Sequence, residues 1–226
     1  MRILLVSATA MEIAPIVRSA SPSGERPARS GDRPSHLQSY TYAGHDVDAL
    51  VTGVGMVATA AWTSRVLAQA RYNFALNVGV CGSFDRALAP GTAVHVVADR
   101  IAELGAEDGD EFVTIQDLHL PAEHEFVNAS PPVNAALGRL PAVSGITVNL
   151  VHGNARSIAA VVERFAPQVE SMEGAAFMFA CLIHEIPFAQ VRAVSNIVET
   201  RNRGAWRMAD AIACLGETAL NILGDA

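Results

Sequence analysis

The sequence predicts an α/β protein in which helices cover both faces of a central sheet. Short runs rich in Val, Ile and Leu alternate with segments of helical periodicity, and many of these runs are apolar at consecutive positions. Continuous apolar runs are typical of strands that are covered on both faces. Strands that alternate with helices favour a mainly parallel sheet with helices on both sides.

The predicted elements follow one another along the whole chain. Strands are predicted at residues 3–7, 47–51, 74–80, 93–97, 146–151 and 188–195. Helices are predicted at residues 57–70, 157–165, 172–185 and 205–223. In the last two helices, apolar side chains recur with a period near 3.6, which places them on one face of the helix.

Two segments lie outside this alternation. Residues 19–35 are rich in Ser, Pro, Gly and Arg, which is typical of an exposed and mobile loop. Residues 103–134 contain several acids, three prolines and two histidines. Long excursions of this kind are functional or disordered in most compact domains.

Length and composition predict one domain that spans residues 1–226. Of the 226 residues, 50% are hydrophobic and 17% are charged, which is enough for one well-filled core. The 16 basic and 23 acidic residues give a net charge of −7. This charge disfavours a nucleic-acid surface, which needs a basic patch. The expected partner is a small molecule.

The cysteines and the N-terminus favour a cytoplasmic protein. Cys81, Cys181 and Cys214 are widely spaced in apolar surroundings, so we expect buried thiols in a reducing compartment. The apolar run at residues 3–7 is short and Glu12 soon follows it, which predicts a first strand rather than a secretion signal. No run approaches the ~20 apolar residues of a membrane span, so no membrane association is expected.

A glycine-rich turn follows the second predicted strand. Gly53, Gly55 and Ala58 match the spacing of a dinucleotide-binding fingerprint. That fingerprint also needs an acid at the end of the next strand to bind a ribose, and here the next acid is Asp85. We therefore expect no nicotinamide cofactor. The glycines predict a tight turn whose backbone closely approaches a neighbour or a ligand.

Four segments with polar residues or glycines stand at or just beyond the carboxyl ends of predicted strands. They are ATAMEI (8–13), NVGVCGSF (77–84), VESMEGAA (169–176) and VRAVSNIVE (191–199). In open α/β sheets, ligands bind at this edge. The candidate site is therefore expected there.

The segment VESMEGAA, followed downstream by RAVSN, resembles the nucleoside phosphorylase and nucleosidase family, and the resemblance extends over nearly the whole chain. It implies a three-layer α/β/α fold with a central twisted mixed sheet, and cleavage of a purine nucleoside. It also implies that Glu173 binds the ribose 2′-hydroxyl and that Met172 packs against the sugar. Glu12 would orient and deprotonate the attacking water, and Ser195 and Asn196 would hold the purine.

The resemblance implies further substrate contacts from Val80, Cys81 and Gly82. Arg192 is also a candidate site residue, because it would orient the base-binding loop. In the alternative, Arg192 is a surface charge at the end of a strand. Family members build the site at a subunit contact, so we expect at least a homodimer. Phe112, in the long excursion, is a candidate to reach the pocket of a neighbouring subunit.

The chemistry of N-glycosidic cleavage agrees with the two catalytic carboxylates. Positive charge develops on the sugar carbon, and a carboxylate held nearby stabilises that charge more in the transition state than in the ground state. A hydroxyl bound to a carboxylate also gains strength as the ring becomes cationic. Glu173 stands where a helix is about to begin, and anions are favoured at helix N-termini.

The sequence favours water over phosphate as the nucleophile. Phosphorylases of the hexameric bacterial type carry an Arg and a Ser where this chain has Asn77 and Val80. A valine side chain forms no hydrogen bond to phosphate, and a neutral amide is a poor substitute for a guanidinium. Glu12 would also place negative charge where phosphate binds.

Asn196 favours a 6-oxopurine base. Nucleosidases that act on adenine carry an aspartate at this position, which accepts from the 6-amino group and donates a proton to N7. The amide of Asn196 donates to N7 or O6, which are both acceptors in hypoxanthine and guanine. A neutral amide is a poor general acid, so water or another residue would have to protonate the leaving base.

No metal is expected. His119 and His124 lie near Glu123 and Glu125, but their spacing does not place two ligands on one helical face, and Pro121 disfavours a helix there. These histidines are expected to be solvated in a loop.

Three alternatives to a 6-oxopurine nucleosidase stay open. They are an adenine-type nucleosidase, a purine nucleoside phosphorylase and a non-catalytic nucleoside-binding module. The sequence also leaves open the roles of Glu170, Glu199, Arg201 and Trp206, and the group that the ribose carries at its 5′ position.

Overall fold

The computed structural model describes residues 1–23, 36–109 and 111–226. Its strands are β1 (Arg2–Ser7), β2 (Ser21–Pro22), β3 (Leu37–Tyr42), β4 (His45–Val51), β5 (Phe74–Ser83), β6 (Ala93–Ile101), β7 (Gly105–Asp108), β8 (Glu111–Thr114), β9 (Glu125–Val127), β10 (Ala142–Thr147), β11 (Val169–Ser171) and β12 (Phe188–Ile197). Its helices are α1 (Ala10–Ser19), α2 (Met56–Gln69), α3 (Ala135–Gly138), α4 (Ala155–Phe165), α5 (Gly174–Ile183), the 3₁₀ turn η1 (Arg203–Ala205) and α6 (Met208–Gly224).

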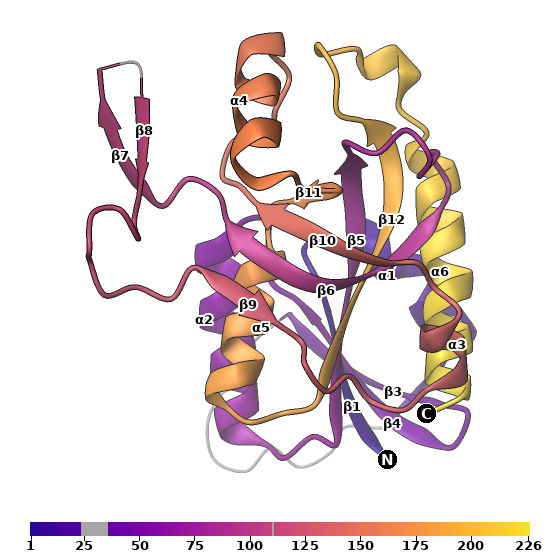
Figure 1. Cartoon of the computed structure of the whole chain (residues 1–226). Helices are drawn as coiled ribbons and strands as arrows, with labels where there is room; N and C mark the ends of the chain where they lie inside the picture. Colours follow the sequence, from indigo (N-terminus) through magenta and orange to yellow (C-terminus); the bar gives the residue numbers. More distant parts are fainter. Residues whose placement is uncertain (24–35, 110) are drawn as a thin grey trace.

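Helices cover both faces of a mixed sheet, as Figure 1 shows. In the described residues the sheet has the order β11-β10-β6-β12-β5-β1-β4-β3-β2, with β9 paired to β6. β1 is parallel to β4 and β5, and β5 is parallel to β12, whereas β12 and β6 are antiparallel. The expected three-layer α/β/α fold with a central mixed sheet is confirmed.

Part of the sheet closes on itself. β11 pairs with β10 on one side and with β5 on the other, so that β5, β12, β6, β10 and β11 form a ring of hydrogen-bonded strands. The closure brings β11, which carries Glu170, against the end of β5 at Gly82. It therefore joins segments that are far apart in the sequence at one edge of the sheet.

Alternate residues of the strands enter different cores. In β1, Leu4 and Val6 pack in the core that contains α2 and α5, while Ile3 and Leu5 pack in the core that contains α1 and α6. This is the period of two that a strand imposes on its side chains. Consecutive apolar residues are therefore required when both faces are covered, which is why the apolar runs of the sequence predict these strands.

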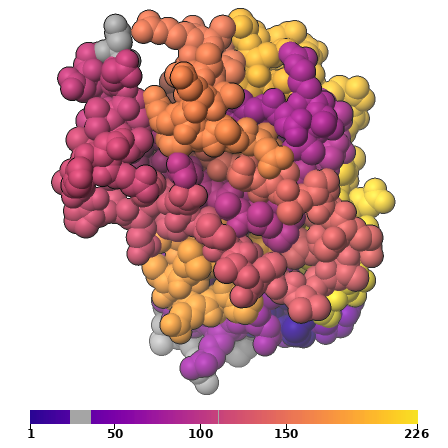
Figure 2. All heavy atoms as spheres, viewed as in Figure 1, coloured from indigo at the N-terminus to yellow at the C-terminus, as the bar shows by residue number. Residues whose placement is uncertain are grey.

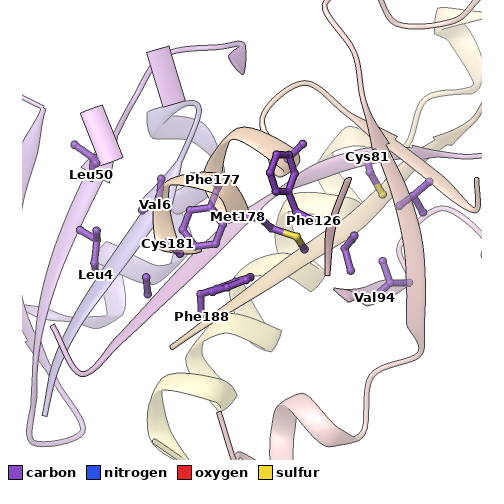
Figure 3. Packing of buried hydrophobic residues seen from close by; sticks show 14 of the residues in the cluster. Leu4, Val6, Leu50, Cys81, Val94, Phe126, Phe177, Met178, Cys181 and Phe188 are labelled. Atoms are coloured by element: carbon purple, nitrogen blue, oxygen red, sulfur yellow. The ribbon is translucent and has the colours of Figure 1, made fainter. Parts of the chain in front are cut away.

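The core beneath α5 is dense in aromatic side chains. Phe177 and Phe188 meet edge to face, with ring centroids 5.9 Å apart, and Met178 and Cys181 are fully buried beside them (Figure 3). Such aromatic pairs add about 0.5–1.5 kcal/mol beyond the burial of their area. This packing fixes the position of α5 and thus of the residues at its start.

Most predicted elements are confirmed with shifted ends, but some predictions are wrong. The strand predicted at residues 146–151 is β10, which ends at Thr147, because the next residues turn toward Glu103, which accepts the main-chain N–H of Asn149. The helix predicted at residues 172–185 begins only at Gly174. Within residues 103–134, three short strands form where a long excursion was expected.

Several elements have no counterpart in the sequence-based prediction. Among them are α1, β3, α3 and β11. Pro15 lies inside α1, although proline lacks an N–H and disfavours a helix interior. Gly216 of α6 leaves room for the proline ring, because a Cβ on Gly216 would lie 2.5 Å from Cβ of Pro15. Of the loop predicted at residues 19–35, residue 19 ends α1 and residues 21–22 form β2, while residues 24–35 lie outside the described residues.

The hairpin of β7 and β8 stands away from the sheet and beside α4 (Figures 1 and 2). A groove of about 510 Å³ separates the hairpin from α4. Phe112 of the hairpin lies under the guanidinium of Arg164, whose carbon is 4.1 Å from the ring centroid. Among the helices of the described residues, none has the length and apolar character required to cross a membrane.

Candidate active site

The carboxyl ends of β1, β5 and β12 meet the start of α5 around a cavity of about 280 Å³. The four segments singled out in the sequence all contribute to it. The cavity is lined by Ala8, Thr9, Met11, Glu12, Val54, Val80, Cys81, Gly82, Val151, Glu170, Ser171, Met172, Glu173, Ser195, Asn196, Trp206, Met208 and Ile212.

Glu12 projects from the first turn of α1 into the cavity. Its Oε2 atom accepts hydrogen bonds from the main-chain N–H and the hydroxyl of Thr9, at 2.8 and 2.9 Å. Its Oε1 atom accepts from the main-chain N–H of Val80, at 3.2 Å. These donors come from two separate segments of the chain, so they hold the carboxylate rigidly. Only 7% of Glu12 is exposed. Charge-assisted bonds of this kind are stronger than neutral ones.

Glu173 occupies the N-cap position of α5 but does not cap its own helix. Its Oε1 atom accepts a hydrogen bond of 3.1 Å from the main-chain N–H of Gly55. Gly55 is the N-cap residue of α2. Gly55 has a φ of 99°, a conformation that glycine adopts readily. The close approach predicted for this glycine turn is confirmed, and its neighbour is the Glu173 carboxylate.

The environment of Glu173 changes its ionisation. Burial raises the pKa of Glu173 above its ordinary value, because the charged form is poorly solvated. The positive charge of Arg192 and the Gly55 N–H oppose this rise, and the neighbouring charge of Glu12 adds to it. Two carboxylates thus share one cavity, with a buried cation behind them.

Arg192 is that cation, and it lies beneath the cavity rather than in its wall. Only 1% of the residue is exposed, so the alternative of a surface charge is wrong. Its Nη2 atom donates to Oδ1 of Asn77 at 2.6 Å. A Cβ atom on Gly79 would lie 2.2 Å from Nη1 of Arg192 and 3.1 Å from Oε1 of Glu12, so this glycine makes room for both side chains.

Ser195 and Asn196 lie at an irregularity in β12. The register with β5 shifts between Val194 and Asn196, which is the mark of a β-bulge, and bulges often reorient side chains next to active sites. Nδ2 of Asn196 donates to the carbonyl of Ile197 at 3.0 Å. The Ser195 hydroxyl donates to Oδ1 of Asn196 at 2.8 Å. The second N–H of the Asn196 amide is left for a ligand.

Glu170 is a further buried acid of the cavity. It is 4% exposed, and its carboxylate accepts from the main-chain N–H and from Nδ1 of His152, at 3.1 and 2.7 Å. The sequence left its role open. Glu170 lies in β11, a strand of only three residues. The pairing of β11 with β5, which closes the sheet, brings Glu170 to the cavity.

The remaining wall is largely apolar. Val80, Cys81, Gly82 and Met172 line the cavity as expected for ligand contacts. Burial raises the pKa of the Cys81 thiol to about 12, which makes this thiol unreactive at neutral pH. Sequence reasoning missed several lining residues, namely Met11, Val54, Val151, Met208 and Ile212, because apolar residues of loops and helix ends carry no distinguishing pattern.

Phe112, Glu199 and Arg201 do not line the cavity. Phe112 packs against Arg164 of its own chain and lines the groove beside α4. The structure thus does not bring Phe112 and Glu173 together within one chain, and a contact with a neighbouring subunit stays a prediction. Trp206 does line the cavity, and the guanidinium of Arg201 lies 5.7 Å from its ring centroid. Glu199 lies 3.9 Å from Arg86.

Among the described residues, no group of three or more His, Cys, Asp or Glu side chains is placed to hold a metal. His119 is exposed and His124 half-buried, each with Nδ1 near a main-chain carbonyl two residues earlier. Neither histidine lines the cavity.

The mixed α/β sheet and the acidic cavity at its carboxyl edge define a member of the phosphorylase superfamily. The model of that family matches residues 2–222, and the chain belongs to it. Among characterised relatives, the chain is similar to a futalosine hydrolase of Streptomyces coelicolor, with 31% identity over 95% of this chain and 92% of that protein. A futalosine hydrolase of Thermus thermophilus is 30% identical over 78% of this chain and 80% of that protein.

Solved structures have the same fold. A futalosine hydrolase of Helicobacter pylori superposes with a TM-score of 0.79 at 14% identity, covering 100% of this chain and 98% of that one. A 5′-methylthioadenosine/S-adenosylhomocysteine nucleosidase of Neisseria meningitidis, in complex with methylthio-immucillin-A, has a TM-score of 0.79 at 16% identity, covering 100% and 99%. At these identities the match concerns the fold.

Proposed function

We propose that this protein hydrolyses the N-glycosidic bond of futalosine, releasing hypoxanthine, as a step of menaquinone biosynthesis. The observation that carries the proposal is the pair of buried carboxylates, Glu12 and Glu173, in one cavity at the carboxyl edge of the sheet. Three relatives support it, because they are futalosine hydrolases that are 31%, 30% and 34% identical to this chain over 95%, 78% and 79% of its length.

In the proposed mechanism, Glu173 accepts a hydrogen bond from the ribose 2′-hydroxyl. As the bond to the base breaks, the base departs with the electron pair and takes a proton from water. C1′ becomes cationic, and the carboxylate stabilises this charge in a site of low dielectric. Met172, the preceding residue, packs against the sugar. Glu12 orients a water molecule and takes its proton as the water attacks C1′. The donors from Thr9 and Val80 hold Glu12 in place for this step.

Water is the proposed nucleophile rather than phosphate. Among the described residues that line the cavity, none is a lysine or an arginine. Arg192 lies behind the wall and donates to Asn77, so neither member of this pair faces the cavity. Val80 presents a main-chain N–H, and Glu12 already accepts it. A dianionic phosphate would therefore meet three carboxylates, Glu12, Glu170 and Glu173, without a cation in the cavity wall to compensate.

The base-binding groups favour a 6-oxopurine. The orientation of the Asn196 amide leaves an N–H for N7 or O6 of the base, because its oxygen accepts from Ser195. An adenine nucleosidase would need an acceptor for the 6-amino group at this position. The methylthioadenosine alternative is thus less favoured.

We further propose that the protein is a cytoplasmic homodimer that completes its site at the subunit contact. Two lining residues of the cavity, Met11 and Val54, are 59% and 57% exposed, and Val57, three residues after Val54, is 84% exposed. Apolar side chains gathered at one place are typical of interaction surfaces. The three cysteines are all free, in agreement with a reducing compartment.

The experiment is a substrate panel with chromatographic detection of the released base. Futalosine, its 6-amino analogue, inosine and methylthioadenosine are each incubated with and without phosphate. We expect hypoxanthine release from futalosine at a rate that does not depend on phosphate. Turnover that requires phosphate would establish a phosphorylase, and a preference for methylthioadenosine would overturn the assignment of the base.

A further inference from the structure

The sheet register places Glu170 and Asn196 on either side of one glycine. Gly82 of β5 is paired with Glu170 of β11 and with Asn196 of β12. A Cβ atom on Gly82 would lie 3.3 Å from Nδ2 of Asn196, 3.4 Å from Cγ of Glu170 and 2.8 Å from Cγ2 of Val198, so a side chain does not fit there. All three of Gly82, Glu170 and Asn196 line the cavity. A flat ring over Gly82 would meet an amide along one edge and a carboxylate along another.

The Glu170 carboxylate is held in this position by His152. Oε1 accepts the main-chain N–H of His152 at 3.1 Å, a second contact from that N–H reaches Oε2 at 3.4 Å, and Nδ1 of the ring lies 2.7 Å from Oε2. An ionised carboxylate only accepts, so the ring proton is on Nδ1. Two carboxylate oxygens offer about four acceptor sites, and the contacts with His152 leave acceptor capacity for a ligand.

Hypoxanthine and adenine differ in the groups that they present to such a carboxylate. A 6-oxopurine carries a hydrogen on N1 and an acceptor at O6, whereas a 6-aminopurine carries a lone pair at N1 and a donor at N6. A carboxylate accepts from N1–H and repels the N1 lone pair. Asn196 donates to N7 or O6; N7 is common to both bases, so the amide favours a 6-oxopurine only through O6.

We propose that Glu170 is the specificity-determining residue for the base, accepting a hydrogen bond from N1–H of a 6-oxopurine, with His152 as its positioning residue. The inference rests on the proposed function, because it assigns the edge at which the same nucleoside is recognised. It also explains a buried acid that takes no part in the attack on C1′. A site built to pair with a polar hydrogen rejects ligands that lack it, because its own buried group is then left unpaired.

The first test uses the unmodified protein and free bases, measured by calorimetry. We expect hypoxanthine to bind about 10- to 100-fold more tightly than 1-methylhypoxanthine, which has no hydrogen on N1, and more tightly than adenine. Equal affinity for hypoxanthine and 1-methylhypoxanthine would overturn the inference. This test needs no variant, so it does not depend on whether a substituted protein folds.

The second test uses Glu170→Gln, whose amide can donate to the N1 lone pair of adenine. We expect the ratio of kcat/KM for futalosine to that for its 6-amino analogue to fall about 10- to 100-fold. Glu163→Gln, the same substitution at an exposed position of α4, should leave the ratio unchanged. His152→Ala should lower the ratio less, while His152→Asn, which keeps a side-chain donor, should restore part of it.

An unchanged ratio in a folded Glu170→Gln protein would show that the pair with His152 is structural only. Failure of the proposed function has a different signature. In that case the unmodified protein would release no hypoxanthine from futalosine, while the calorimetric comparison of the bases would still report on Glu170.

Discussion

At the scale of single residues, Glu173 is the group on which we propose that bond cleavage depends most. Its Oε1 atom accepts a hydrogen bond from the Gly55 N–H. Burial raises the pKa of Glu173, and the positive charge of Arg192 lowers it. Glu173→Gln keeps the shape of the side chain and removes the charge. We expect kcat for futalosine to fall about 10²–10³-fold with a small change in KM, because the interaction forms chiefly in the transition state.

Steady-state kinetics test this prediction: kcat and KM are measured for Glu173→Gln and, as a control, for the exposed Glu163→Gln. Unaltered turnover in the Glu173 variant would revive a role for the chain as a nucleoside-binding module without catalysis. A rise in KM alone would mean that Glu173 only binds the ribose in the ground state.

The pH dependence of activity reports on the same carboxylate. Glu173 must be ionised to stabilise a cationic sugar, and burial raises its pKa above the ordinary value of 4.5. As the pH decreases, the carboxylate is therefore protonated earlier than an exposed glutamate, and kcat/KM should fall with a midpoint above 4.5. Arg192 lowers the pKa of Glu173, so Arg192→Met should move the midpoint to still higher pH.

The control for Arg192→Met is Arg139→Met, which removes an exposed guanidinium far from the cavity. A profile of kcat/KM against pH for the three proteins provides the comparison. If the acidic limb has the same midpoint in the Arg192 variant, the two groups do not interact and the electrostatic account of the site is wrong.

At the scale of elements, the start of α5 is fixed by a buried polar network. Asp99 accepts from Gln190 and Thr147, at 2.9 Å each, and Thr147 in turn accepts the main-chain N–H of Ala175. A Cβ atom on Gly174 would lie 2.1 Å from Oδ2 of Asp99 and 2.3 Å from Nε2 of Gln190. The first residue of α5 must therefore be a glycine for the helix, and with it Glu173, to reach its place.

Gly174→Ala is expected to lower the free energy of unfolding by about 1–3 kcal/mol, since overpacking of a buried site displaces its neighbours. Chemical denaturation measures the change. Gly138→Ala is the matched control, because Gly138 also lies in a helix and a Cβ there would meet nothing within 4 Å. Equal stability of the two variants would mean that the network yields without cost.

The elements also show which parts of the fold the sequence predicts. β1 and β5 are recognisable because both faces are covered and their apolar runs are continuous. α1 was missed because Pro15 signals a helix end, and only Gly216 of a distant helix makes room for it. β11 was missed because three residues carry no periodicity and its partners are β10 and β5.

For the site, the family motifs identify Glu12, Glu173 and Asn196 as candidates, and the structure places all three in one cavity. The position of Arg192 was not predictable, because a charged residue near a strand end normally faces solvent. Its burial depends on Asn77 of another strand and on the missing side chain of Gly79. Such long-range requirements leave no local pattern in the sequence.

At the scale of the whole molecule, the cavity opens toward an apolar surface. Met11 and Val54 line the cavity, Val57 follows Val54 by three residues, and all three residues are more than half exposed. A second copy of the chain that covers this surface would exclude water from the cationic sugar, which strengthens every electrostatic contact inside the cavity.

Val57→Asp tests the subunit contact without altering a residue of the cavity wall. Val57 lies in the first turn of α2, where an acid is favoured by the helix dipole, so the fold should persist. We expect the unmodified protein to sediment as a dimer and Val57→Asp to shift toward monomer, because a buried charge at an interface is unpaired. Val133→Asp places the same charge at a position that is 103% exposed and distant from the cavity, and should remain dimeric. An unmodified protein that sediments as a monomer at assay concentration, yet cleaves futalosine at full rate, would mean that one chain holds the complete site.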